Sequence, residues 1–193
     1  MSEPPEGGEA AEGEIDESLY SRQIFVLGKE AMLRMARAHV LISGLNGLGV
    51  EAAKNVCLAG VKTVTLHDTK LVTWYDLNSQ FYCNQSHLGK NRAESCVKLV
   101  AELNTYTPTT HYMDELTEDY IKKFGVVCLA DNTFEDQVRV GKICRANKIE
   151  FIVCETKGLF GKVTSTFRKL YKCILIFKYF WPGLLRWAQE AWG

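Results

Sequence analysis

The residues whose types and spacing could do chemistry form a glycine cluster: Gly44, Gly47 and Gly49. An apolar run, residues 40–42, precedes the cluster, and an alanine-rich stretch typical of a helix follows it. Strand, glycine turn and helix in that order direct backbone N–H groups and a helix N-terminus at a phosphate group. A second apolar run, residues 63–67, ends at Asp68, about 20 residues beyond the turn, where a carboxylate that binds ribose would lie. The pattern is typical of a nucleotide-binding turn.

One position departs from the full pattern Gly-x-Gly-x-x-Gly. When Gly44 and Gly49 are aligned with the outer glycines, Asn46 takes the middle position. A glycine there lets a pyrophosphate approach the backbone, and the Asn46 side chain would crowd that ligand. The sequence therefore predicts the fold and leaves nucleotide binding open.

Composition excludes several classes of protein. The 193 residues suit one domain with extensions, and Lys plus Arg equals Asp plus Glu at 23 each, so no charge excess indicates nucleic acid or a membrane surface. The seven cysteines form no Cys-x-x-Cys pair and the four histidines are scattered, so we expect no metal site. Several cysteines lie in apolar runs, which indicates reduced, buried thiols in a cytoplasmic or nuclear protein.

The two ends of the chain differ from its middle. Residues 1–17 are acidic and rich in Gly, Pro and Glu, and we expect a disordered tail rather than a signal or transit peptide. Residues 168–193 form a divergent apolar tail that holds three of the four tryptophans. Lys172, Lys178 and Pro182 interrupt it, so no run reaches the about 20 residues of a membrane span, and a membrane-surface segment is the alternative.

Between these tails, residues 18–167 predict one α/β domain. We expect helices over residues 29–38, 48–59, 89–103, 116–124 and 133–147. We expect strands over residues 40–42, 63–67, 109–112, 126–130 and 150–155. Strands without polar alternation, separated by helices, indicate a doubly wound, mainly parallel, Rossmann-like sheet with helices on both faces. Residues 69–87 are a long polar and aromatic connection, which is typical of a functional loop.

Four stretches carry a resemblance to a known family. They are residues 20–23 with 26–28, residues 44–55, residues 76–81 with 89–94, and residues 158–161. In order and spacing they resemble the N-terminal, inactive adenylation half (ThiF/MoeB-like) of a ubiquitin-activating enzyme, over residues 15–161. Such enzymes adenylate ubiquitin with ATP and Mg²⁺ in a pseudo-dimer of two related halves, of which only the second binds ATP.

The resemblance also implies site residues. Asp68 matches the ribose carboxylate, Asn78 the first residue of an Asn-Arg-Gln-Phe motif, Lys90 the phosphate lysine and Asp131 the Mg²⁺-binding aspartate. Ser79 replaces the motif's arginine, so Asn46 and Ser79 both argue that this chain alone binds no ATP. As alternatives, Asp68 caps a turn, Lys90 is a solvated helix start, and Asp131 is the N-cap of the helix beginning at Thr133.

Arg22 has a separate role in the family pattern. The resemblance implies an arginine finger that reaches the ATP phosphates of the active half in trans, where a fork-shaped cation stabilises phosphate charge. The alternative is a surface arginine paired with Asp16 or Glu17. The family's catalytic cysteine belongs to a separate domain, and none of the cysteines here is expected to act as a nucleophile.

The partners implied are the active adenylation half and ubiquitin or a ubiquitin-like modifier. Beyond residue 161 the chain departs from the family pattern, which predicts a truncated or alternatively terminated product. Three other functions remain open. They are a regulatory subunit of an activating enzyme for a ubiquitin-like modifier, an NAD-dependent oxidoreductase, which Asp68 permits, and a non-catalytic module that sequesters a partner.

Overall fold

The structure is a computed structural model that describes residues 15–158 and 160–166. Its helices are α1 (Ser21–Leu27), α2 (Lys29–Met35), α3 (Gly47–Leu58), α4 (Arg92–Ala101), α5 (Glu118–Ile121) and α6 (Phe134–Asn147), with short 3₁₀ turns η1 (Asp76–Asn78) and η2 (Gln85–His87). Its strands are β1 (His39–Ser43), β2 (Thr63–His67), β3 (Thr109–Tyr112), β4 (Val126–Ala130), β5 (Glu150–Lys157) and β6 (Phe160–Thr166). Predictions for residues 1–14 and 167–193 lie outside the described residues.

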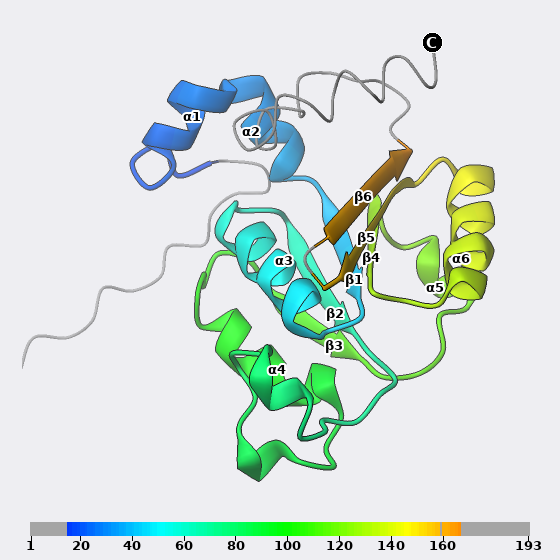
Figure 1. Cartoon of the computed structure of the whole chain (residues 1–193). Coiled ribbons are helices and arrows are strands. Elements are labelled where there is room, and N and C mark those ends of the chain that lie inside the picture. The colour runs from blue at the N-terminus through cyan, green and yellow to red at the C-terminus, as the bar shows by residue number, and fades with distance from the viewer. Residues whose placement is uncertain (1–14, 159, 167–193) are drawn as a thin grey trace, which may run out of the picture.

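The six described strands form one sheet in the order β3-β2-β1-β4-β5-β6 (Figure 1). Every neighbouring pair is parallel except β5 and β6, which are antiparallel. The chain winds outward from β1 to β3, then returns to β4 beside β1 and winds the other way. The order thus reverses between β1 and β4, and ligands of such sheets bind outside the carboxyl ends of the strands at this point. The expected doubly wound, mainly parallel fold is confirmed.

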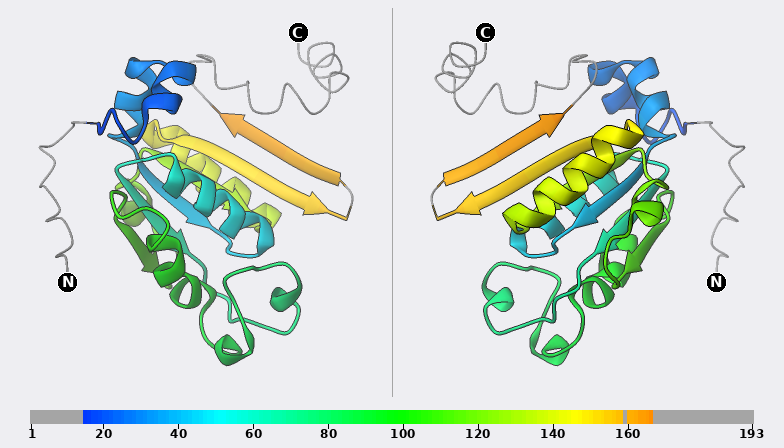
Figure 2. Two further views of the ribbon diagram at one scale, coloured as in Figure 1. Left: turned by 90° about the vertical axis from the view of Figure 1, so that its left-hand side faces the viewer. Right: turned by 90° about the vertical axis from the view of Figure 1, so that its right-hand side faces the viewer.

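Helices cover both faces of this sheet (Figure 2). The core accordingly divides in two, because successive side chains of a strand point to opposite faces. On the face covered by α3 and α4, Ile42 and Val64 pack with side chains of both helices. On the other face, Leu41 and Val127 pack with residues of α5 and α6. The central strands β1 and β4 are apolar without alternation because both of their faces are covered.

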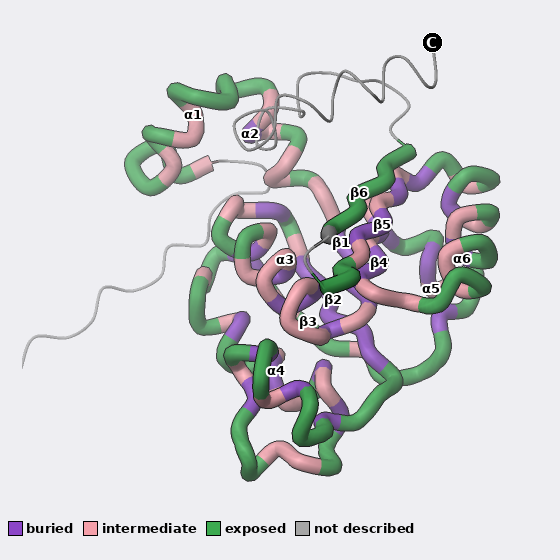
Figure 3. The backbone as a smooth tube through the Cα atoms, viewed as in Figure 1, coloured by how far each residue is buried: buried purple, intermediate pink, exposed green. Residues whose placement is uncertain are grey.

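Most residues of the N-terminal arm, residues 15–38, and of β6 are exposed (Figure 3). Neither α1 nor β6 was predicted. Helix α1 has no buried residue, so its sequence carries no amphipathic spacing. Strand β6 is an edge strand, and its six residues from Gly161 to Thr166 are exposed, so its sequence is polar.

Several predicted boundaries were too wide. Helix α2 ends at Met35 rather than at residue 38, and α5 covers Glu118–Ile121 rather than residues 116–124. Helix α4 begins at Arg92 because the Asn91 side chain caps it, accepting from the backbone N–H groups of Ala93 and Glu94. In the part of the chain that the structure describes, no helix has the length and apolar character to span a membrane.

Candidate functional site

Gly44 and Gly49 lie where no side chain would fit. Gly44 has a φ of 91°, in the left-handed region that favours glycine. A Cβ on Gly44 would lie 2.1 Å from the carbonyl oxygen of Ala130. A Cβ on Gly49 would lie 1.7 Å from the carbonyl oxygen of Gly44. Both glycines are therefore required for the turn to pack on itself and on the end of β4.

Loop 69–87 folds over the first turn of α3 through Ser79. A Cβ on Gly47 would lie 2.8 Å from both the Cβ and the carbonyl oxygen of Ser79. The next residue, Gln80, is buried, with its Nε2 donating to the Leu45 carbonyl at 3.4 Å. Asn78, which the resemblance marks as a site residue, is exposed. The long loop thus covers the turn instead of leaving it open.

Asn46 occupies the N-terminus of α3. Its Oδ1 accepts from the backbone N–H of Gly49 at 3.1 Å, which makes it the helix N-cap. Its Nδ2 donates to Asp131 Oδ2 at 2.6 Å. A helix N-terminus in such a turn is where phosphate binds, because its N–H groups have no partner within the helix. Here a carboxamide of the chain itself takes one of those N–H groups.

The side chain of Asp131 accepts three hydrogen bonds. Its backbone is in the left-handed region, with a φ of 49°. Besides Asn46, the backbone N–H and the hydroxyl of Thr156 donate to it, at 2.6 and 2.8 Å. Burial raises the pKa of Asp131, but the hydrogen bonds from Thr156 and Asn46 and the charge of Lys157 outweigh burial, so the pKa is lowered overall. The alternative that Asp131 caps α6 is wrong, because Thr133 is that N-cap.

Asp68 is 4% exposed, and both of its oxygens are engaged. Oδ2 accepts from the backbone N–H of Leu45 at 2.8 Å, and Oδ1 accepts from that of Lys70 at 2.9 Å. Arg92 Nη1 lies 3.5 Å from Oδ2. The carboxylate thus ties the end of β2 to the glycine turn, as the turn-capping alternative predicted.

Arg92 is a residue of this site that the sequence did not single out. Its Nη2 also pairs with Asp76 Oδ1 at 2.7 Å, and Asp76 is 5% exposed. Burial raises the pKa of Asp76, but hydrogen bonds from Thr73 and the Arg92 guanidinium outweigh it and lower the pKa. The motif at residues 89–94 contains Arg92, yet the family pattern drew attention to Lys90, which is exposed and precedes α4.

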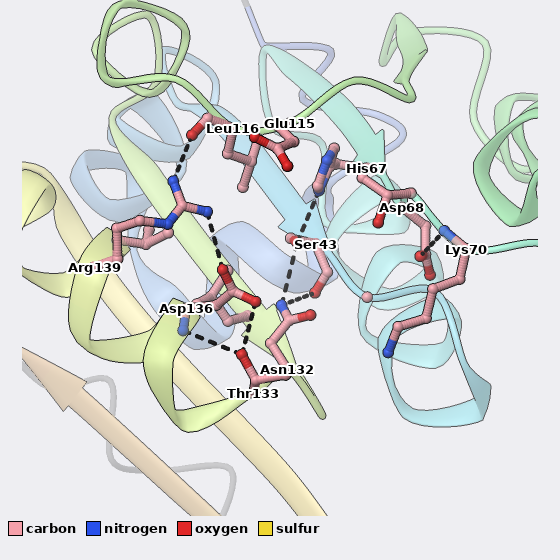
Figure 4. A pocket seen from close by; sticks show the side chains of 14 residues that line it. Ser43, His67, Asp68, Lys70, Glu115, Leu116, Asn132, Thr133, Asp136 and Arg139 are labelled. Carbon is pink, nitrogen blue, oxygen red and sulfur yellow. Dashed lines mark hydrogen bonds and ion pairs between the residues drawn. The ribbon is translucent and has the colours of Figure 1, made fainter.

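A cavity of about 340 Å³ opens at the carboxyl ends of β1, β2 and β4, and Figure 4 shows its lining. Asn132 Nδ2 donates to Ser43 Oγ at 3.2 Å, and Ser43 Oγ lies 2.8 Å from His67 Nδ1. His67 Nε2 lies 2.9 Å from the Asp114 carbonyl, which requires the proton on Nε2. Burial lowers the pKa of His67, which favours the neutral imidazole, and its Nδ1 accepts a hydrogen bond from the Ser43 hydroxyl. These side chains satisfy one another.

Arg22 lies far from this site along the sheet. Helix α1 lies in the arm that precedes the start of β1, whereas the glycine turn follows the end of β1 (Figure 2). Glu17 pairs with Lys29 at 2.5 Å, and Asp16 accepts from Ser18, so the alternative in which Arg22 pairs with either carboxylate is wrong. Arg22 is exposed and forms no ion pair with a described residue.

The described cysteines are buried, as expected, except Cys128, which is half-buried. Burial raises the pKa of the Cys96 thiol to about 12 and the pKa values of Cys83 and Cys144 to about 11. Such thiols are poor nucleophiles at neutral pH because the thiolate is the reactive form. The described residues contain no group of three His, Cys, Asp or Glu side chains that could hold a metal ion. Cys173 lies outside the described residues.

The fold and the turn define a doubly wound α/β domain with a glycine turn of the nucleotide-binding type at the point where the strand order reverses. The chain belongs to the ThiF family, whose model matches residues 20–180. It is related to ubiquitin-activating enzymes, as the sequence motifs predicted.

Ubiquitin-like modifier-activating enzyme 1 of Homo sapiens and that of Oryctolagus cuniculus are each 52% identical over 157 residues. The match covers 81% of this chain and 15% of each relative. Ubiquitin-activating enzyme E1 1 of Candida albicans (strain WO-1) is 47% identical over 154 residues, which cover 80% of this chain and 15% of the relative. The chain thus spans a small part of the length of these relatives.

Among solved structures, the chain is similar to E. coli tRNA N6-threonylcarbamoyladenosine dehydratase, TcdA, with a TM-score of 0.61 and 23% identity. The match covers 71% of this chain and 59% of that one. A second structure of TcdA, in complex with AMP, matches with a TM-score of 0.60. At this identity the likeness concerns the fold alone.

Proposed function

We propose that the chain is the non-catalytic adenylation half of a ubiquitin-activating enzyme, which acts as a pseudo-dimer scaffold and supplies Arg22 to an active half. The observation that carries the proposal is that the side chains of Asn46, Asp68 and Asp131 around the glycine turn are engaged within the chain. Asn46 caps α3, Asp131 binds Asn46 and Thr156, and Asp68 binds two backbone N–H groups. The relatives named for activating ubiquitin-like modifiers support the family assignment.

ATP and Mg²⁺, which the family's active half uses, do not fit the residues present. A ribose hydroxyl would have to share Asp68, which is 4% exposed, with two backbone donors and Arg92. A magnesium ion would have to compete with the three donors that Asp131 already accepts from. The relation to TcdA, which has been crystallised with AMP, concerns the fold and not these contacts. The same contacts of Asp68 argue against NAD binding and an oxidoreductase.

The surface of the arm supports the part of the proposal in which the chain binds an active adenylation half and supplies Arg22 to it. Phe25 and Val26 on α1 are 91% and 77% exposed, beside the exposed Arg22. Adjacent large apolar side chains at that exposure are typical of a surface that a partner covers. A guanidinium on such a surface can reach phosphates bound by the partner, where it stabilises the charge of the transferring group. Ubiquitin or a ubiquitin-like modifier would be the substrate of the assembly, in the cytoplasm and nucleus.

A reconstitution tests the proposal. The 193-residue chain is mixed with a separately expressed active adenylation half, and association is measured by sedimentation while adenylation is measured by ATP–pyrophosphate exchange. We expect association at micromolar concentration and exchange that depends on this chain. Calorimetric titration of the chain alone with ATP and Mg²⁺ should give no heat of binding, and tight binding would contradict the proposal.

Further assays distinguish the other candidate functions. Thioester formation tested with ubiquitin and with ubiquitin-like modifiers distinguishes a ubiquitin enzyme from a regulatory subunit for another modifier. A chain that associates but lowers exchange below that of the active half alone would be a sequestering module. Titration with NAD tests the oxidoreductase alternative.

A further inference from the structure

Tyr20 is the residue from which α1 starts, and its ring lies on Gly60. Its backbone carbonyl accepts from the Ile24 N–H at 2.9 Å, which begins the helix. A Cβ on Gly60 would lie 2.7 Å from the Cζ and the hydroxyl oxygen of Tyr20. Gly60 also has a φ of 79° just beyond the end of α3. Only glycine provides both the left-handed turn and a bare backbone surface for the ring.

The hydroxyl of Tyr20 is fixed as well. Asn104 Nδ2 donates to it at 3.0 Å and also donates to the Cys57 carbonyl in the last turn of α3 at 2.8 Å. Asn104 follows α4, so the tyrosine joins the arm to the ends of both helices that cover one face of the sheet. The sequence marked Tyr20 only as part of the motif at residues 20–23.

The rest of α1 contributes little to holding the arm. The helix has no buried residue, and Phe25 and Val26 are directed to solvent. Helix α2 buries Met32 alone. A short helix with no buried face frays unless tertiary contacts hold it. Tyr20, two residues before Arg22, is therefore a contact that fixes the first turn of α1 on the domain.

We infer that Tyr20 is a positioning residue for Arg22, held in place by Gly60 and Asn104. The inference rests on the proposed function, in which Arg22 acts on phosphates bound by the active half. A guanidinium that must meet a transferring phosphate requires a fixed backbone, because displacement by about 1 Å can cost 10²-fold in rate. Loss of the tyrosine contact leaves the arm attached through α2 but frees the turn that carries Arg22.

The test is a double-mutant cycle in the reconstituted assembly. Tyr20→Ala, Arg22→Ala and the double variant are assayed for kcat and KM of ATP–pyrophosphate exchange. Tyr20→Phe keeps the ring on Gly60 and removes the hydrogen bond from Asn104. Tyr106→Ala is the matched control, because Tyr106 lies two residues from Asn104 and its side chain makes no hydrogen bond with a described residue. Trypsin cleavage after Arg22 reports the order of the arm without any activity measurement.

We expect Tyr20→Ala to lower kcat about 10-fold or more, with KM for ATP unchanged, and to lower it no further in the Arg22→Ala background. We expect Tyr20→Phe to lower kcat about two- to ten-fold, the range for one hydrogen bond. This variant tests the inference even when Tyr20→Ala does not fold. Trypsin should cleave Tyr20→Ala faster after Arg22 than the parent chain or Tyr106→Ala.

Two results would overturn the inference and one would overturn its basis. Equal losses from Tyr20→Ala in both backgrounds would mean that the tyrosine does not act through Arg22. Full activity of Tyr20→Ala and Tyr20→Phe, together with a loss in Arg22→Ala, would remove the positioning role and leave the proposed function intact. Full activity of Arg22→Ala would instead refute the proposed function, and the inference with it.

Discussion

The glycine turn and the arm lie at opposite ends of β1. The polar side chains of the turn are paired within the chain, whereas Arg22 on the arm is exposed. At the turn, Asn46, Asp68 and Asp131 each find partners within the chain. On the arm, Arg22 is exposed beside the exposed Phe25. Buried polar groups are costly unless they are paired, whereas exposed ones remain available to another molecule. The side chains of the turn are therefore used for internal stability, and the arm leaves charged and apolar side chains available to a partner.

The largest expected effect is on the rate of ATP–pyrophosphate exchange, and it tests the role given to the arm. Arg22→Ala should lower ATP–pyrophosphate exchange in the reconstituted assembly on the order of 10³-fold, because a finger arginine stabilises phosphate charge only during transfer. The urea midpoint of the chain should not change, since Arg22 forms no ion pair with a described residue. The exposed Arg37 is the control, and its replacement by Ala should leave the exchange rate unchanged.

The next effect concerns the buried charges beside the turn. Arg92→Met leaves Asp68 and Asp76 without their cation, and the expected loss in the free energy of unfolding is about 3–5 kcal/mol. Urea denaturation measures it. The matched change Arg37→Met, at an exposed arginine, should alter stability by less than about 0.5 kcal/mol. Equal stability of the two variants would contradict the role given to Arg92.

A smaller effect is expected at the N-terminus of α3. Asn46→Ala removes the cap and one donor to Asp131, and we expect a loss of about 1–2 kcal/mol in the free energy of unfolding. Asn55→Ala, at an exposed position of the same helix, is the control and should be neutral or slightly stabilising. If Asn46→Ala is as stable as the parent chain, the capping contact does not hold the turn in solution.

The smallest effect is a pH dependence of stability through Asp131. Its pKa is lowered in the folded chain, so its contribution is complete above the unfolded pKa of about 3.9 and is lost as the pH falls through the folded value. The difference in the free energy of unfolding between the parent chain and Asp131→Asn should therefore shrink below about pH 4. Asp114→Asn, at an exposed side chain, is the control for the exchange of an aspartate for an asparagine.

The sequence predicted most of the sheet, and the signal was clearest at the central strands, where buried parallel strands leave continuous apolar runs. The predicted strands at residues 63–67, 109–112 and 126–130 have the observed boundaries. It missed α1, whose adjacent apolar residues Phe25 and Val26 face solvent rather than a core. It also missed β6, whose pairing depends only on the neighbouring β5.

The site was predictable in its residues but not in its contacts. The sequence identified the glycines, Asn46, Asp68 and Asp131. It could not show that Arg92 reaches Asp68 and Asp76, because these pairs form only when loop 69–87 and the start of α4 meet the end of β2. The sequence also could not show that Thr156 binds Asp131, since the two residues are 25 positions apart in the chain. Short-range patterns indicate caps and turns, and they carry no information on such distant partners.

The contact between Gly44 and Gly49 has a consequence for how glycine signatures are interpreted. Because a side chain at either position would collide with backbone, folding alone is enough to preserve both glycines over evolution. A domain of this kind can lose every affinity for nucleotides and still display the outer glycines of the fingerprint. The spacing of those two residues therefore records ancestry and architecture, and the residue between them reports on ligand binding.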